Sequence, residues 1–274
     1  MDDFKLKELM PDELRRYMNA EDERRYLLVD VRQPAEYAAV RIPGAVLMPL
    51  MELESRLFEL PADRELVFYC RTGARSQVAA MLAAEAELSD QTVYNLVGGV
   101  LAWEGRKLSD FPRIQVFDAG AAHGDVLMTA MDLEKGAWRF YRQIWETIGQ
   151  EAFAPTIREL ALAEEGHARM IYAFWKRNQA DPPAFENLFE TLKGEILESG
   201  QPLEAALQRL SAATVDRGLN ILELALDIEY RAYDLYRNIA EKTSDTEQRD
   251  TLLTIAQAEK KHMRVIGRAL GEQG

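Results

Sequence analysis

Two short motifs contain the same pair of metal-binding residue types. Glu164 and His167 lie three positions apart, and Glu259 and His262 repeat that spacing 95 residues later. Residues i and i+3 of a helix share a face, so each glutamate can reach the same point as its histidine. Two of the three histidines in the chain belong to these motifs. The pattern favours two ligand pairs of one metal site over two solvated helix faces.

The motifs belong to a longer internal repeat. Residues 130–146 align without gaps with 225–241, and 156–171 align with 251–266. A repeated two-helix unit predicts a four-helix domain. The connection between the repeats, residues 176–217, is expected to contain weaker helices near 184–198 and 203–213.

The repeat also matches Glu134 with Glu229, and each lies among apolar residues on a face expected to be buried. A buried carboxylate is costly unless it is paired or binds a cation. Four carboxylates and two imidazoles from four helices would satisfy one another through two divalent ions. The predicted metal ligands are Glu134, Glu164, His167, Glu229, Glu259 and His262.

The only cysteine, Cys70, suggests a second chemistry. It ends a predicted strand and precedes a predicted helix, the position where α/β sheets bind ligands. Backbone N–H groups of such a loop, together with the helix N-terminus, stabilise a thiolate and a bound anion. Glycine at position 73 permits the tight curve. The predicted anion-binding loop consists of Arg71, Thr72, Gly73, Ala74, Arg75 and Ser76.

Besides a nucleophile for sulfur transfer, two other roles are open for this cysteine. It could be a buried structural residue, or the nucleophile of a phosphatase or arsenate reductase. Those enzymes need five residues between cysteine and arginine to surround a tetrahedral oxyanion. Four residues separate Cys70 and Arg75, which favours sulfur chemistry.

The elements that position these residues divide the chain into two domains. Strands predicted at 27–31, 45–49, 66–70 and 92–96 alternate with helices at 50–59 and 74–88, which indicates a mainly parallel α/β sheet. From about residue 125 onward only helical periodicity is found. We therefore expect an α/β domain over 1–111, a linker over 112–124 and an all-α four-helix bundle over 125–274. His123, in the linker, is given no role.

Composition limits the partners and the compartment. The net charge of −13 without a basic patch argues against nucleic acid. A single cysteine excludes an intrachain disulfide and any four-cysteine metal site. The charged N-terminus and the lack of an 18-residue apolar run predict a soluble, cytoplasmic protein with no membrane partner.

The first domain resembles a single-domain rhodanese. The resemblance rests on "LLVDVRQPAEYAAVRIPGAVLMPL", "VFYCRTGARSQVAAMLA" and "VYNLVGGVLAWEG". It implies that Cys70 accepts sulfane sulfur from a small donor such as thiosulfate, and that a thiol or cyanide removes it from the persulfide. Asp30, Arg32 and Glu36 match a family segment, in which Arg32 and Glu36 are expected to pair. Position 41 is Arg in this chain, whereas many family members have a histidine there. We expect no loss of sulfur transfer from this difference.

The second domain resembles the rubrerythrin type of ferritin-like protein over about residues 125–270. The resemblance implies a centre of two iron ions, with manganese or zinc as alternatives, bound by the six residues above. It also implies reduction of peroxide or O₂ with electrons from an external donor, rubredoxin-like or a flavoprotein, and a homodimer. Tyr141 and Tyr236 lie two helical turns beyond Glu134 and Glu229, and either hydrogen-bond ligand carboxylates or simply pack.

Two departures leave a different function open. The chain lacks the four cysteines of a rubredoxin-like module, and Leu226 and Ala232 stand where some members have an additional metal-binding glutamate nearby. The alternative hypothesis is an iron-storage or metal-sensing bundle joined to a persulfide carrier that serves a protein partner.

Overall fold

The computed structural model describes residues 6–86, 92–112, 114, 123–149, 151–212 and 216–273. The chain divides into two compact units, of which the first contains residues 1–112 and the second contains most of the remainder. The units are described separately below.

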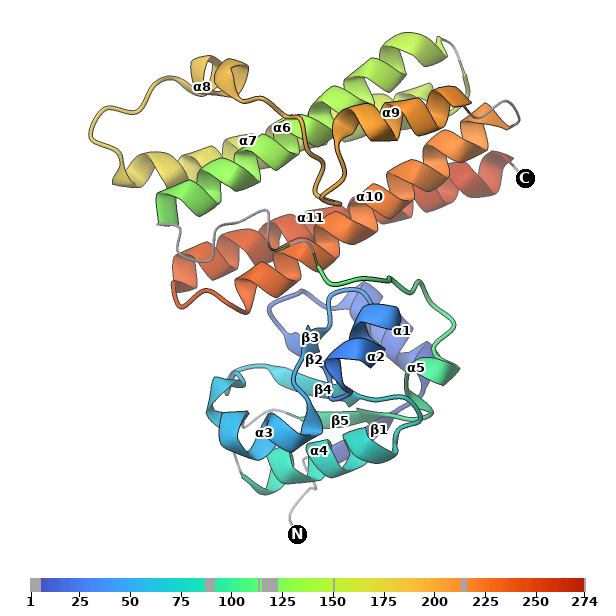
Figure 1. Ribbon diagram of the computed structural model, residues 1–274, viewed down its shortest axis with the longest axis vertical. Coiled ribbons are helices and arrows are strands. Elements are labelled where there is room, and N and C mark those ends of the chain that lie inside the picture. Colours follow the sequence, from blue (N-terminus) through green and yellow to red (C-terminus); the bar gives the residue numbers. More distant parts are fainter. Residues whose placement is uncertain are drawn as a thin grey trace. The chain divides into compact units, whose positions relative to one another are not determined.

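The first unit contains a five-stranded parallel sheet with the strand order β1-β5-β4-β2-β3 (Figure 1). The strands are β1 (Leu6–Leu9), β2 (Tyr26–Asp30), β3 (Val46–Leu47), β4 (Glu65–Tyr69) and β5 (Val93–Leu96). The helices are α1 (Pro11–Ala20), α2 (Pro34–Ala39), α3 (Leu50–Arg56), α4 (Ala74–Glu85) and α5 (Gly99–Ala102), with a 3-10 turn, η1, at Leu57–Glu59. This arrangement confirms the predicted α/β class.

Helices cover both faces of this sheet. On one face Leu27 of β2 lies in the same core as Ala79 of α4, and on the other Leu28 lies with Leu14 of α1. All five residues of β2 are buried, as expected for a parallel strand covered on both sides. The edge strand β1 was not predicted, because its central residues Lys7 and Glu8 are exposed and leave only a weak apolar pattern.

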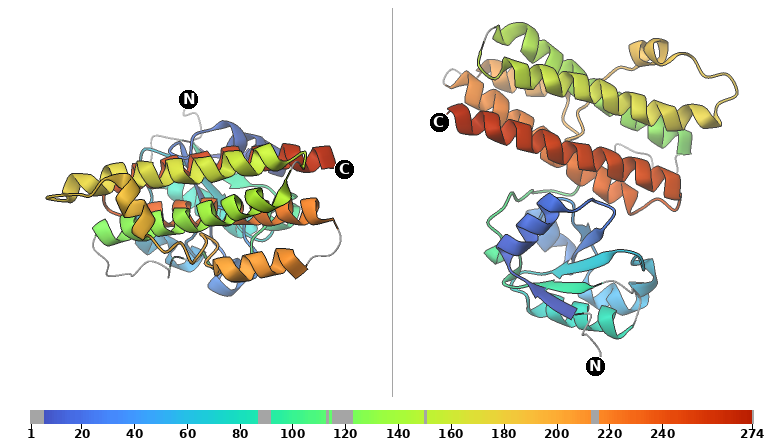
Figure 2. Two further views of the ribbon diagram at one scale, coloured as in Figure 1. Left: turned by 90° about the horizontal axis from the view of Figure 1, so that it is seen from above. Right: turned by 180° about the vertical axis from the view of Figure 1, so that it is seen from behind.

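Four long helices form the bundle in the C-terminal part of the chain. They are α6 (His123–Ile148), α7 (Ala154–Trp175), α10 (Arg217–Ala240) and α11 (Thr246–Gln273). Figures 1 and 2 show α6 beside α7 in one layer and α10 beside α11 in the other. Aromatic and aliphatic side chains such as Phe140, Ile157 and Leu222 fill the core. The predicted helical bundle is confirmed.

The crossover between the two hairpins differs from its prediction. It contains a 3-10 turn, η3 (Lys176–Asn178), and the short helices α8 (Phe185–Thr191) and α9 (Leu203–Ala212). The predicted helix near 184–198 is therefore confirmed over 185–191 and wrong over 192–198. Gly194 and Gly200 take positive φ values of 54° and 72°, and an antiparallel bridge joins Ile196 to Pro202. These features fold residues 192–202 into a compact non-helical segment.

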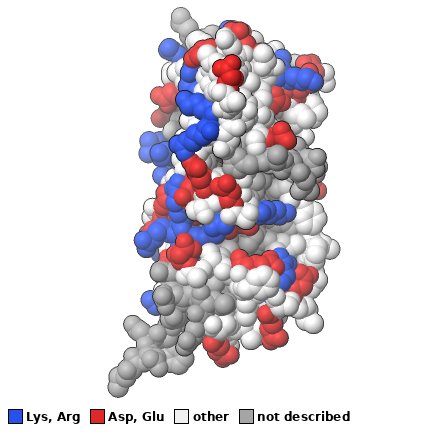
Figure 3. Space-filling model, turned by 90° about the vertical axis from the view of Figure 1, so that its left-hand side faces the viewer, with Lys and Arg blue, Asp and Glu red and all other residues white. Residues whose placement is uncertain are grey.

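Charge is mixed over the face drawn in Figure 3, where basic side chains lie among acidic ones. Among the residues described, no helix is both long enough and apolar enough to span a bilayer.

Candidate functional sites: a buried carboxylate–histidine cluster and a cysteine loop

The six predicted metal ligands lie together inside the bundle. Each of the four long helices contributes to the cluster: α6 and α10 provide one glutamate each, and α7 and α11 provide a glutamate and a histidine each. All six are buried, with the most exposed at 9% of its surface. The cluster consists of Glu134, Glu164, His167, Glu229, Glu259 and His262.

The imidazole of His167 marks one half of the cluster. Its Nδ1 lies 3.2 Å from Glu134, 3.1 Å from Glu164 and 3.3 Å from Glu259. Two ligand atoms that bind one ion at about 2.1 Å and at a right angle lie about 3 Å apart. These spacings therefore suit a common ion.

The imidazole of His262 marks the other half. Its Nδ1 lies 2.9 Å from Glu229, 3.0 Å from Glu259 and 3.8 Å from Glu164. The two imidazole rings are stacked with their centroids 5.1 Å apart. Glu164 and Glu259 are common to both halves.

Both tyrosines contact the cluster across the repeat. The hydroxyl of Tyr141 donates a hydrogen bond to Glu229, and that of Tyr236 donates one to Glu134. Each tyrosine thus bonds the glutamate of the other repeat. Burial, followed by the charge of the bonded glutamate, raises the pKa of both phenols well above its ordinary value. The tyrosines therefore remain neutral donors.

The electrostatics of the cluster favour bound cations. Burial lowers the pKa of His167, but Glu259, Glu134 and Glu164 outweigh it, so the pKa is raised well above its ordinary value. Burial and the charge of Glu229 raise the pKa of Glu164. Two protonated histidines offset only half of the charge of four ionised carboxylates. Two divalent ions would offset all of it, so the donor set fits a di-metal centre.

The Cys70 loop joins the carboxyl end of β4 to α4. The buried Sγ accepts hydrogen bonds from the backbone N–H of Gly73 at 3.1 Å and from the Ser76 hydroxyl at 3.5 Å. Gly73 has a φ of 100°, which favours glycine. A Cβ at Gly99 would lie 2.4 Å from the carbonyl oxygen of Cys70. A glycine is therefore also needed at position 99, where the segment after β5 packs against the cysteine loop.

This environment favours the thiolate. Burial alone raises the pKa of Cys70, but the hydrogen bonds from the Ser76 hydroxyl and from the backbone of Ser76, Thr72 and Gly73 outweigh burial and lower it. The Ser76 hydroxyl has a single proton, and the side-chain oxygen of Asn95, 2.7 Å away, is an alternative acceptor for it. Asn95 was not identified from the sequence. Its signal is a polar residue in the otherwise apolar strand β5.

The charged residues around the loop pair differently from the prediction. Arg32 binds Asp30, with 2.8 Å between Nε and Oδ1, and the expected Arg32–Glu36 pair is wrong. Glu36 instead binds Arg75 through two contacts of 2.7 and 2.8 Å. Arg75 thus lies beside the loop with its position held by α2. Of the other predicted loop residues, Arg71, Thr72 and Ala74 are exposed, and Gly73 and Ser76 are buried.

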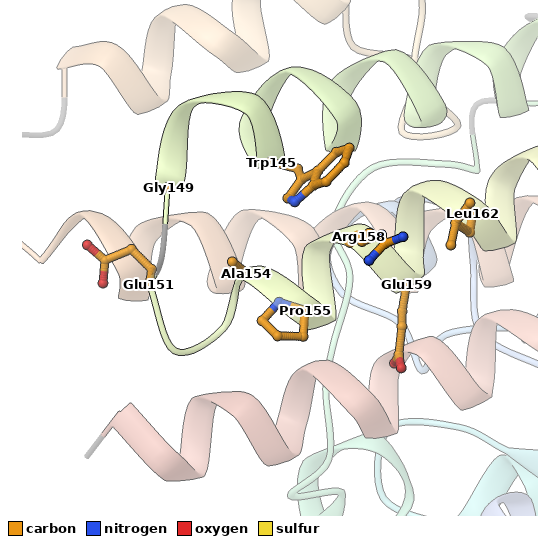
Figure 4. Close-up of a pocket in the computed structure, with 8 residues that line it drawn as sticks. All are labelled: Trp145, Gly149, Glu151, Ala154, Pro155, Arg158, Glu159 and Leu162. Atoms are coloured by element: carbon orange, nitrogen blue, oxygen red, sulfur yellow. The ribbon is translucent and has the colours of Figure 1, made fainter.

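A separate hollow lies at the turn between α6 and α7 (Figure 4). It has a volume of about 480 Å³ and lies between Trp145 and Leu162, with Arg158 over the indole ring. None of the predicted site residues lines it. The hollow therefore belongs to neither the buried cluster nor the cysteine loop.

The first part of the chain is similar to sulfurtransferases. Residues 10–106 match the Rhodanese-like domain family. A "Sulfurtransferase" of Allochromatium vinosum is 44% identical over 77 residues, which cover 28% of this chain and 70% of that protein. The "Putative sulfurtransferase YtwF" of Bacillus subtilis is 35% identical over 102 residues, which cover 37% of this chain and 94% of that protein.

Larger relatives share only this part. The "Probable adenylyltransferase/sulfurtransferase MoeZ" of Mycobacterium tuberculosis is 40% identical over 97 residues, and the chain spans 24% of its length. A rhodanese-like domain protein of Staphylococcus aureus has a solved structure that is 25% identical, with a TM-score of 0.33, over 36% of this chain and 93% of that one.

The remainder of the chain matches a different family. Residues 125–270 match the Rubrerythrin family, which is ferritin-like. A match to this family implies a di-iron site. This match covers more than half of the chain and includes every residue of the buried cluster. The chain therefore belongs to the rubrerythrin family, with a rhodanese sulfurtransferase domain preceding its ferritin-like bundle.

Proposed function

We propose that Cys70 transfers sulfane sulfur. The thiolate attacks the outer sulfur of thiosulfate, a Cys70 S–S bond forms, and the S–S bond of thiosulfate breaks to release sulfite with its electron pair. A thiol or cyanide then attacks the outer sulfur of the persulfide, and the Cys70 thiolate is regenerated. The loop amides, with Arg71 and Arg75, hold the anion. The hydrogen bonds that lower the pKa of Cys70 support this assignment.

We propose that the bundle is a redox metal centre of the same enzyme. Two bound irons would supply the electrons that reduce peroxide or O₂. Glu164 and Glu259 would bridge the ions, Glu134 and Glu229 would each bind one, and the tyrosines orient these last two carboxylates. Electrons would come from an external rubredoxin-like protein or flavoprotein, since the one cysteine in this sequence cannot build a four-cysteine iron centre.

The observation that carries the metal assignment is the shared position of Glu164 and Glu259 between two stacked imidazoles. Elemental analysis after anaerobic reconstitution with iron tests it. We expect about two ions per chain, as in other bundles with this ligand set, and an oxo-bridged ferric absorption band after oxidation. Fewer than about one ion per chain would contradict the assignment.

Steady-state peroxide consumption with an artificial reductant tests the redox role. A catalyst continues to consume peroxide while reductant lasts, whereas a storage bundle gives one burst of oxidation and then stops. Because Cys70 must be a reduced thiol to act, we also propose that the protein works in a reducing compartment such as the cytoplasm.

A further inference from the structure

Glu198, in the crossover, is a buried carboxylate outside the repeat. Its exposed fraction is 2%, and neither carboxylate oxygen has a hydrogen-bond partner in the described part of the chain other than its own backbone N–H. Such a group is strongly unfavourable unless a cation or donor satisfies it. Burial, followed by the charges of Glu134, Glu164 and Glu259, raises its pKa. Glu198 therefore lies within the electrostatic field of the metal cluster.

The segment that carries Glu198 has a defined fold of its own. The backbone N–H of Leu197 donates to the carbonyl of Gln201 at 2.9 Å, and that of Gly200 donates to Leu197 at 2.7 Å. Both Leu197 and Glu198 are buried, whereas Glu195 is exposed. The turn thus directs one glutamate of this segment inward and another outward.

Helix α6 holds this segment close to the cluster. Asp132 accepts a hydrogen bond from the N–H of Gly194 at 3.1 Å, and Arg139 donates to the carbonyl of Gly194 at 3.1 Å. A Cβ at Gly136 would lie only 2.2 Å from the carbonyl oxygen of Ile196. Because Gly136 is two residues beyond Glu134, a glycine at this position lets the crossover backbone pack beside a metal-binding residue.

We infer that Glu198 is a fifth carboxylate ligand of the metal centre, supplied by the crossover on the side of Glu134, whose carboxylate lies 3.2 Å from His167. This inference rests on the proposed di-metal function. The ion beside His167 would then have one more protein ligand than the ion beside His262. The two ions would be unequal despite the repeat, and the ion beside His262 would keep more positions for an external molecule.

Titration of metal-free full-length protein with Co²⁺ tests this inference, with calorimetry for affinity and visible absorption for coordination. The variant is Glu198→Gln, and the matched control is Glu195→Gln from the exposed side of the same segment. We expect two ions in the wild type and the control. In Glu198→Gln one of the two sites should bind at least about tenfold more weakly, with changed Co²⁺ absorption bands.

Melting temperatures separate a ligand from a structural residue. Metal-free Glu198→Gln should melt at or above the wild-type temperature, because it removes a buried carboxyl whose ionised form is unfavourable there, and Co²⁺ should stabilise it less. Wild-type titration and absorption in Glu198→Gln, or a lower melting temperature without metal, would overturn the inference. Failure of the wild type to bind Co²⁺ would instead overturn the proposed metal function itself.

Discussion

The two centres of this chain are assembled in opposite ways. The Cys70 loop is contiguous, and its sulfur is stabilised chiefly by backbone N–H groups and one serine hydroxyl. The buried cluster collects side chains from four helices, with 128 positions between Glu134 and His262. The loop therefore offers backbone dipoles, with Arg71 and Arg75 nearby, to an anion, whereas the cluster gathers carboxylates whose charge bound cations would offset. The first centre depends on local geometry, and the second depends on the whole bundle.

The largest expected effect separates the chemistry of the two centres. Replacing Cys70 by Ser should lower the thiosulfate:cyanide sulfurtransferase rate by more than about a thousandfold, because the nucleophile is lost. Iron content, measured on the same preparation, should stay unchanged. Residual turnover close to wild type would refute the role of Cys70.

The converse change is Glu164→Gln in the cluster. Because Glu164 would bridge both ions in the proposed centre, the iron content should fall below about one ion per chain, against the expected two in the wild type. Glu165→Gln is the control, since that neighbouring glutamate binds Arg169 on the surface of the same helix. Sulfur transfer should be normal in both variants. A loss of sulfur transfer in Glu164→Gln alone would show that the centres are not independent.

A smaller effect is expected from Tyr236→Phe, which removes the hydrogen bond to Glu134 but keeps the ring. Metal affinity should fall by about tenfold, as is usual when a ligand loses its orienting partner. Tyr141→Phe should have a comparable effect through Glu229, because the two contacts are related by the repeat. Titration with Co²⁺ measures both, and unchanged affinities would mean that the tyrosines only pack.

The smallest effect concerns the pH dependence of the loop. A lowered pKa keeps Cys70 ionised at pH values where an ordinary thiol is protonated, so sulfur transfer should persist toward acidic pH. Ser76→Ala removes one stabilising hydrogen bond, which raises the pKa and moves the acidic limb of the profile to higher pH. The rate on the alkaline plateau should change little. A limb that does not move would exclude Ser76 as a stabiliser of the thiolate.

The contrast between the centres also explains what the sequence could predict. Four of the five strands, the long helices and the six cluster residues follow from periodicity and from a gapless repeat. Glu198 could not be found in this way, because it lies in the crossover, has no counterpart at repeat spacing and is buried by a turn that depends on Gly194 and Gly200. The Glu36–Arg75 pair was missed for a related reason, since it joins two helices 39 positions apart.

The exchanged tyrosine contacts have a consequence for how the bundle is built. One hairpin alone would contain a glutamate, a Glu-x-x-His motif and a tyrosine whose acceptor lies in the other hairpin. Two identical hairpins could complete one another as a symmetric pair, so the present chain is equivalent to such a pair joined covalently. The crossover is the one part of the bundle that the symmetry would not duplicate. Joining the halves thus creates the opportunity for two equivalent metal positions to become different.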